Sequence, residues 1–257
     1  MIALVTGAAG GLGSEFSKQL AEKGYDLVIT DIDKKGLLAL KKEIQTKNNI
    51  RIHSIVSDVS KPDGADKILN FIRKNKLEIS TLINNVGIGY RSSFLNTSAD
   101  YWSYMIRINM ECMMTLTFYI INEMKIRNEG QVLNVASMAG FQPVPWMNIY
   151  AASKIFVLHF SESLTYELRN TKIKISTLCP GPVMTPGIEY ARIDITKIAK
   201  PSWRSKEYVI KKALEGLEKN KYIIVPGFFN ALQVHIQRFM PRIFPLMVTG
   251  KMYKIDN

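Results

Sequence analysis

Short apolar runs alternate with segments of helical periodicity along most of the chain. The apolar runs, in chain order, are IALVT from residue 2, YDLVIT from 25, RIHSIV from 51, STLINN from 80, VLNVA from 132, IKISTL from 173 and YIIVPG from 222. Between them, apolar residues recur at helical spacing, as at Leu37, Leu40 and Ile44. Strands separated by helices predict an α/β fold with a doubly wound parallel sheet and helices on both faces.

The segment after residue 227 departs from this alternation. It is rich in large apolar residues, which are interrupted by prolines and by the cations Arg238, Arg242, Lys251 and Lys254. Two short amphipathic helices are predicted here, and an apolar face beside cations suits a membrane interface. The alternative is that the segment packs on the rest of the chain or on a second subunit. We therefore divide the chain into a main domain, 1–227, and an extension, 228–257.

A hydroxyl, a phenol and an ammonium follow one of the predicted strands. Ser137 comes directly after VLNVA, and Tyr150 and Lys154 begin the next helical run, four residues apart. Positions four apart share one face of a helix, so the last two side chains lie side by side. A positive charge beside a phenol lowers the pKa of the phenol, which can then exchange a proton with an alcohol or carbonyl oxygen. A nearby hydroxyl can hold that oxygen, but a tyrosine–lysine pair alone is a weak signal.

The first strand leads directly into a glycine-rich turn, TGAAGGLG at 6–13, and then into a helix. Glycines permit a tight turn and a close approach of the backbone to a pyrophosphate. The N-terminus of the following helix offers N–H groups and a partial positive charge to such an anion. The spacing differs from the G-x-G-x-x-G fingerprint, and an ordinary strand-to-helix turn is the alternative interpretation of this motif alone.

Asp31 ends the second predicted strand. An acid roughly twenty residues after a glycine-rich turn can hydrogen-bond the ribose of a bound adenosine. Capping of the next helix is the alternative role, although Asp33 is also placed for it. A carboxylate here would repel a 2′-phosphate, so Asp31 predicts NAD rather than NADP. Lys34 and Lys35 are the only nearby cations and could soften that preference.

Together these motifs resemble the short-chain dehydrogenase/reductase family, and the resemblance covers nearly the whole chain. NNVG at 84–87 is similar to the family's NNAG motif, and PGPVMT at 180–185 is similar to the segment that meets the nicotinamide. The resemblance implies a seven-stranded Rossmann fold and an NAD(P)-dependent alcohol dehydrogenase or carbonyl reductase that needs no metal. The stretch 137–154 resembles the branch that contains ketoacyl reductases and hydroxysteroid dehydrogenases.

The resemblance also implies which residues form the site. Asn109, Ser137, Tyr150 and Lys154 match the catalytic tetrad. A mid-helix asparagine is usually a surface residue, but in the family it distorts its helix and holds a water near the lysine. The lysine also holds the nicotinamide ribose. The implied cofactor-binding residues are Gly7, Gly10, Gly11, Leu12, Gly13, Asp31, Asp58, Val59, Asn85, Gly87, Tyr150, Lys154, Pro180, Gly181, Val183 and Thr185.

The residues around this motif are mostly apolar and favour a hydrophobic alcohol or ketone, such as a steroid or fatty-acyl compound. The candidate substrate-binding residues are Met138, Phe141, Trp146, Met147, Met184 and Ile188. Residues 186–204 show no strong periodicity and follow the cofactor-binding PGPVMT, which is the place for a substrate lid. We therefore expect 186–204 to cover the substrate.

The composition of the chain limits which classes of binding partner and which cellular locations are expected. The net charge of +12 suits an anionic partner, but no long basic run marks a nucleic-acid arm. Two cysteines and three histidines show neither a disulfide framework nor metal-ligand spacing. No apolar run reaches the roughly 18 residues of a membrane span, and a strand beginning at Ile2 leaves no room for a signal peptide. We expect a cytoplasmic protein, with peripheral membrane contact through 228–254 as a further option.

The resemblance implies a homodimer or homotetramer assembled through the helices at 101–126 and 150–169. Their outward faces are expected to carry apolar residues, namely Met113, Phe118, Phe156 and Phe160, which a monomer would leave partly exposed. Two rival functions are a non-catalytic dinucleotide-binding regulator and a membrane-surface lipid-binding protein. The complete tetrad argues against the regulator, which has no need of a tyrosine and a lysine together.

Overall fold

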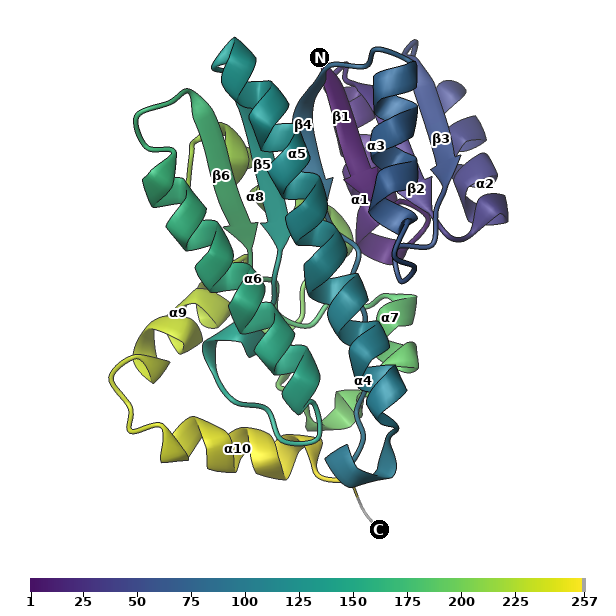
Figure 1. Ribbon diagram of the computed structural model, residues 1–257. Coiled ribbons are helices and arrows are strands. Elements are labelled where there is room, and N and C mark those ends of the chain that lie inside the picture. The colour runs from purple at the N-terminus through teal and green to yellow at the C-terminus, as the bar shows by residue number, and fades with distance from the viewer. Residues whose placement is uncertain (256–257) are drawn as a thin grey trace.

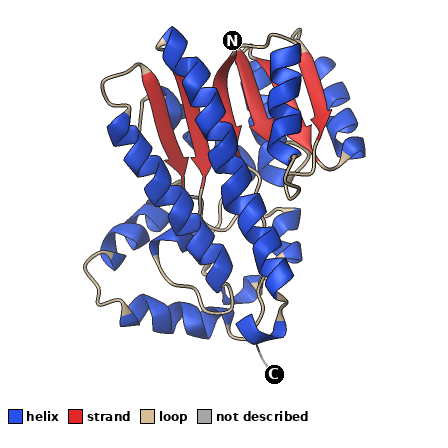
Figure 2. Cartoon of the chain, viewed as in Figure 1, coloured by secondary structure: helices blue, strands red, loops and turns tan. Residues whose placement is uncertain are grey.

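The computed structural model describes residues 1–255, and a parallel sheet of seven strands lies at the centre of this part (Figures 1 and 2). The strands are β1 (Ile2–Thr6), β2 (Asp26–Asp31), β3 (Ile52–Val56), β4 (Ile79–Asn84), β5 (Gly130–Val135), β6 (Ile173–Leu178) and β7 (Ile223–Ile224). Their order is β3-β2-β1-β4-β5-β6-β7, and every pairing is parallel. The order reverses between β1 and β4, as in a doubly wound Rossmann sheet. The predicted fold class is confirmed.

Helices cover both faces of the sheet because its strands are apolar on both sides. Side chains alternate along β1, where Ala3 and Val5 face one core cluster and Leu4 faces the other. The first face is covered by α1 (Gly11–Glu22), α2 (Lys34–Gln45) and α8 (Lys206–Glu218). The second is covered by α3 (Gly64–Lys74), α5 (Cys112–Arg127) and α6 (Asn148–Glu167).

The long helix predicted at 101–126 is present but interrupted. It begins as α4 (Ala99–Ile106), where the Ser98 hydroxyl caps the first turn by accepting the N–H of Tyr101 at 3.3 Å. A π-helical turn, Arg107–Glu111, separates α4 from α5. Asn109 lies within this turn, so the helix distortion implied by the family resemblance is present.

One residue predicted on the outward face of α5 faces inward instead. Met113 is buried beside Val157 and Leu158 of α6, so the prediction that it lies on the outward face was wrong. It follows Asn109, which also faces α6, by four residues, and positions four apart share one face of a helix. Phe118 is 61% exposed, as predicted. Phe156 and Phe160 stack on each other at 5.8 Å and are half-buried against the same cluster as Met113.

Residues 186–204 and the segment after residue 227 lie beyond the carboxyl ends of the strands (Figure 1). Residues 186–204 form α7 (Pro186–Tyr190) and two 3₁₀ turns, Ile195–Lys197 and Lys200–Ser202. The two helices predicted after residue 227 are present as α9 (Phe228–Gln237) and α10 (Ile243–Tyr253). No helix within residues 1–255 combines the length and apolar content needed to span a bilayer.

Candidate active site

The glycine-rich turn between β1 and α1 is closely packed. Gly7 has φ +63°, and its carbonyl oxygen lies only 1.9 Å from where a Cβ on Gly13 would be, so Gly13 cannot carry a side chain. The Asn85 side chain, at the end of β4, donates to the carbonyl oxygens of Thr6 (2.9 Å) and Gly7 (3.2 Å). Asn85 therefore holds the turn from the neighbouring strand.

The N-terminus of α1 is suited to an anion such as a pyrophosphate. Its N-cap is Gly10, which provides no side-chain cap, and the first turn contains no acidic residue. The first N–H groups of α1 therefore have no hydrogen bond from an N-cap side chain. No acidic side chain in the first turn competes with a bound anion for these groups. Gly10 is exposed, whereas Leu12 points inward and packs on the core.

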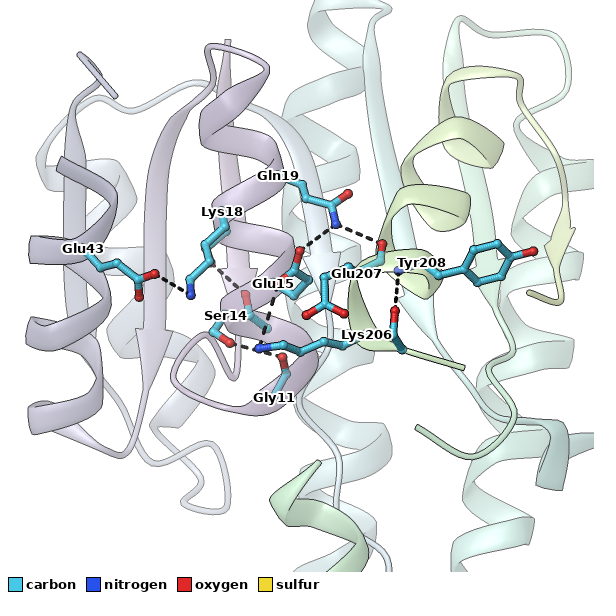
Figure 3. A network of polar contacts seen from close by, with 12 residues as sticks. Gly11, Ser14, Glu15, Lys18, Gln19, Glu43, Lys206, Glu207 and Tyr208 are labelled. Atoms are coloured by element: carbon cyan, nitrogen blue, oxygen red, sulfur yellow. Dashed lines mark hydrogen bonds and ion pairs between the residues drawn. The ribbon is translucent and has the colours of Figure 1, made fainter. Parts of the chain in front are cut away.

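Polar contacts anchor α1 on α8 and α2 behind this turn (Figure 3). Gln19 donates to Glu15 at 2.7 Å and to the carbonyl oxygen of Glu207 in α8 at 3.1 Å. Lys206 lies 4.0 Å from Glu15, and Lys18 forms a 2.7 Å ion pair with Glu43 of α2. These contacts fix the direction of α1 and therefore the direction in which its N-terminus points.

Asp31 is bound to the backbone around the glycine-rich turn. Its Oδ2 accepts the N–H of Ala9 at 3.0 Å, and its Oδ1 accepts the N–H of Asp33 at 3.0 Å. The N-cap position of α2 is occupied by Asp33, so Asp31 does not serve as the helix cap. The carboxylate of Asp31 is therefore fixed at the carboxyl end of β2, beside the turn.

Asp58 and Val59 follow β3 at the same edge of the sheet. The backbone N–H and hydroxyl of Ser60 donate to Asp58 Oδ1 at 3.0 and 2.6 Å. These hydrogen bonds hold the pKa of Asp58 below its usual value, and the bond from the Ser60 hydroxyl has the largest effect. The carboxylate is therefore ionised at neutral pH. Val59 packs on the core beneath.

Ser137, Tyr150 and Lys154 come together where β5 ends and α6 begins. The Ser137 and Tyr150 hydroxyls are hydrogen-bonded to each other. Lys154 is 4% exposed, and its Nζ donates to the carbonyl oxygen of Val135 at 2.9 Å. A Cβ on Gly87 would lie 2.9 Å from this Nζ, so the glycine makes room for the ammonium.

The pKa values of the pair differ from the sequence-based expectation. Burial raises the pKa of Tyr150 above 10, and the hydrogen bond from Ser137 only partly opposes this. Burial lowers the pKa of Lys154 to about 8. The effect of burial is therefore the larger one at Tyr150, and a lowering of its pKa by Lys154 stays a prediction. The ammonium is directed at the Val135 carbonyl oxygen and lies 5.8 Å from the centre of the tyrosine ring.

Asn109 connects the loop after β4 to α6. Its Oδ1 accepts the N–H of Ile88 at 2.8 Å, and its Nδ2 donates to the carbonyl oxygen of Ile88 and to Ser153 Oγ, both at 2.9 Å. Ser153 in turn donates to the carbonyl oxygen of Tyr150 at 2.7 Å. Ser153 was not predicted as a site residue, although its place between the tyrosine and the lysine is a signal in the sequence. The water that Asn109 is expected to hold remains a prediction.

The PGPVMT segment crosses from β6 to the glycine-rich turn. The carbonyl oxygen of Pro180 accepts the N–H of Met138 at 3.0 Å, and Val183 is buried in the core. At the far end, Thr185 Cγ2 lies 2.6 Å from where a Cβ on Gly11 would be. The segment therefore joins the Ser137 region to the start of α1.

Asn230 of α9 supports this segment and was not recognised from the sequence. Its Nδ2 lies 2.5 Å from where a Cβ on Gly181 would be, and it donates to the carbonyl oxygens of Ser202 and Pro226, each at 3.0 Å. The side chain is fully buried. A single polar residue in the apolar first turn of α9 was the available signal.

The candidate substrate residues do not all lie together. Met147 is buried in a cluster with Val144, and Tyr150 and Tyr253 of α10 pack against that cluster. Phe141 instead lies in a separate cluster, beside a cavity of about 690 Å³ between α6, α8 and α9. Tyr253 was not predicted, and burial raises its pKa to about 12.

The remaining substrate candidates flank the Tyr150 cluster. Trp146 has φ +60°, which is rare for a bulky residue, and its carbonyl oxygen accepts the N–H of Ser92 at 2.8 Å. Met138 and Ile188 are half-buried, whereas Met184 is 63% exposed. Residues 1–255 contain no group of three or more His, Cys, Asp or Glu side chains that could hold a metal ion.

Comparison with known proteins identifies the family. A family model described as short chain dehydrogenase matches residues 1–195. The chain is 32% identical to 17-beta-hydroxysteroid dehydrogenase type 3 of Mus musculus over 77% of this chain, and it spans only 65% of that relative's length. It is also 32% identical to very-long-chain 3-oxoacyl-CoA reductase of Homo sapiens, over 86% of this chain and 71% of the relative.

A solved structure is similar over nearly the full length. It is a short-chain dehydrogenase from Sphingobium yanoikuyae in complex with NADPH, with a TM-score of 0.82 and 26% identity. The match covers 93% of this chain and 94% of that chain. Together with the family model, it leads to one conclusion: the chain belongs to the short chain dehydrogenase family.

Proposed function

We propose that the chain is an NAD(P)-dependent oxidoreductase that interconverts an alcohol and a ketone on a hydrophobic substrate. The observation that carries this proposal is the hydrogen-bonded pair Ser137–Tyr150, with Lys154 buried beside it, at the end of β5. The names of the relatives, a hydroxysteroid dehydrogenase and a 3-oxoacyl-CoA reductase, support steroid or fatty-acyl substrates.

Each residue of the tetrad has a distinct task in this proposal. A bound nicotinamide would supply or accept the hydride. The Ser137 hydroxyl holds the substrate oxygen, and Tyr150 donates a proton to it or removes one. Lys154 holds the nicotinamide ribose, and Asn109 fixes the backbone around Tyr150 through Ser153. Burial raises the pKa of Tyr150, so the phenol is present in the protonated form that donates a proton when a ketone is reduced.

The candidate cofactor-binding residues suit a dinucleotide that lies across the carboxyl ends of the strands. The N-terminus of α1, which has no side-chain cap, would bind the pyrophosphate. Asp31 would hydrogen-bond the adenosine ribose, and Asp58 and Val59 would contact the adenine. The PGPVMT segment, with Pro180, Gly181, Val183 and Thr185, would contact the nicotinamide end. We propose NAD rather than NADP as the cofactor because Asp31 is fixed beside the turn with its charge uncompensated by its two backbone partners.

We further propose that residues 186–204 act as the substrate lid on a main domain of 1–227. The lid begins at Pro186, directly after Thr185, which packs against Gly11. Movement of the lid would therefore displace Thr185 relative to the glycine-rich turn. We also propose a homodimer or homotetramer formed through the helices at 101–126 and 150–169, which the exposed apolar residues Phe118 and Ile126 of α5 support. We propose a cytoplasmic location with contact of 228–254 at a membrane surface.

A screen of the wild-type chain tests the proposal. Nicotinamide fluorescence should be followed with steroid, acyl and small alcohol or ketone libraries, in both directions and with both cofactors. Oxidation or reduction of at least one hydrophobic compound is expected. Binding of the dinucleotide without turnover of any compound would instead favour the non-catalytic regulator.

A further inference from the structure

The two C-terminal helices expose a concentration of large apolar side chains. Six residues of this segment are more than half exposed: Phe228, Phe239, Ile243, Phe244, Met247 and Val248. Phe239, in the connection between α9 and α10, is 90% exposed. Monomeric water-soluble proteins rarely leave so many large apolar side chains together in water, and such patches mark an interaction surface.

The charged side chains contributed by residues 219–255 are of one sign, although Glu162 and Glu215 line a cavity beside Arg238. Residues 219–255 contain no aspartate or glutamate. Arg238 and Arg242 flank Phe239, and Lys251 lies one turn beyond Met247 in α10. All three cations are exposed. A segment that combines exposed apolar side chains with cations and contains no acidic residue is complementary to a lipid surface with anionic headgroups.

The two sides of α10 differ. One side is fixed to the loop before α6, where the Thr249 hydroxyl donates to the carbonyl oxygen of Pro143 at 2.9 Å and Tyr253 packs beside Tyr150. The exposed residues 243, 244, 247 and 248 recur at helical spacing on another side. α10 lies across the end of the molecule to which the strands point (Figure 1). It is therefore oriented to lie flat on a surface while contacting the candidate active site.

We propose that α9 and α10 dock the protein on an anionic lipid surface, with Phe239 and the outer side of α10 inserted among the lipids. The docking is independent of the proposed chemistry. Since α10 is about 10 Å across, it also places the Tyr150 cluster close to the bilayer. A hydrophobic substrate can then enter the site from the lipid, a consequence that rests on the proposed function.

Vesicle flotation tests the docking with the full chain. Wild type should float with vesicles of phosphatidylcholine and phosphatidylglycerol and much less with phosphatidylcholine alone. Arg238→Ala combined with Arg242→Ala should weaken binding to the anionic vesicles about 30-fold, since each cation near such a surface contributes about a factor of five. Phe239→Ser combined with Phe244→Ser should weaken binding to both kinds of vesicle by at least about tenfold.

Matched variants separate docking from other effects. Leu38→Ser changes an apolar residue of α2 that is about as exposed as Phe244, and this variant should float as wild type does. Tyr150→Phe should also float normally, so loss of activity and loss of docking are distinguishable. Wild type that stays with the lipid-free fraction, or a Phe239/Phe244 variant that floats unchanged, overturns the proposal. If the Phe239/Phe244 variant floats as wild type does but sediments as a monomer where wild type sediments as a dimer, this surface joins two copies of the chain instead.

The route of entry has its own readout. For a hydrophobic ketone reduced by wild type, the Phe239/Phe244 double variant should raise KM several-fold in the presence of anionic vesicles and leave kcat unchanged. An unchanged KM in a variant that no longer floats would overturn entry from the lipid but not the docking.

Discussion

Asp31 should decide between the two nicotinamide cofactors, and Asp31→Ser should reverse the preference. Its carboxylate is held by the N–H groups of Ala9 and Asp33, each at 3.0 Å, so it cannot easily swing away from a bound adenosine. In NAD binding, this carboxylate accepts hydrogen bonds from the ribose hydroxyls. In NADP binding, it lies against the 2′-phosphate, and two negative charges are brought together.

The size of the effect follows from these two interactions. Two unit charges about 4 Å apart repel by roughly 4 kcal/mol at an effective dielectric constant of 20. Asp31 is half-buried, so solvent reduces this to about 1–2 kcal/mol, or roughly tenfold in NADP affinity. Loss of a hydrogen bond to a charged group costs NAD about 1.5–3 kcal/mol. Together, Asp31→Ser should move the NAD/NADP ratio of kcat/KM by about 100-fold or more.

The assay is kcat/KM with each cofactor for wild type, Asp31→Ser and the control Asp33→Ser. Asp33→Ser removes the same charge two residues away, at an exposed N-cap that has no side-chain cap bond. It should change the ratio only slightly. A wild type that prefers NADP, or an Asp31→Ser variant with an unchanged ratio, would refute the role assigned to Asp31.

Two further predictions concern the support of the site and its ionisation. Asn230→Ala should lower the free energy of unfolding by about 2 kcal/mol, because two buried carbonyl oxygens lose their donor, and should weaken cofactor binding. Asn122→Ala, which removes one exposed hydrogen bond on α5, is the control and should have little effect in denaturant titration or cofactor binding. Because burial lowers the pKa of Lys154 to about 8 and raises that of Tyr150, ketone reduction should be constant near neutral pH. The rate of ketone reduction should fall as the pH rises above about 8. In this range Lys154 loses its charge before Tyr150 ionises and holds the nicotinamide ribose less well. A rate that climbs through this range would contradict the assignment.

The strands and most helices could be predicted because their signals are local. The β2 run, its Asp31 end and the α2 positions Leu37, Leu40 and Ile44 depend on short-range pattern, and the structure places them as expected. Two helices after residue 227 were predicted from the same kind of pattern.

Features that depend on contacts between distant segments were not predictable in this way. Asn109, within the π-helical turn, meets Ile88 and Ser153, and Met113 packs against α6. The raised pKa of Tyr150 comes from burial, which the spacing of a tyrosine and a lysine does not report. Asn230 acts on Gly181 from a segment 49 positions later in the chain, and no local pattern links them.

Proton transfer by Tyr150 can be measured with Tyr150→Phe. We expect this variant to lose nearly all turnover of a ketone that wild type reduces, while its affinity for NADH, measured by fluorescence, stays close to that of wild type. Tyr166→Phe changes an exposed tyrosine on the same helix and should keep full activity. Substantial turnover by Tyr150→Phe would contradict the account.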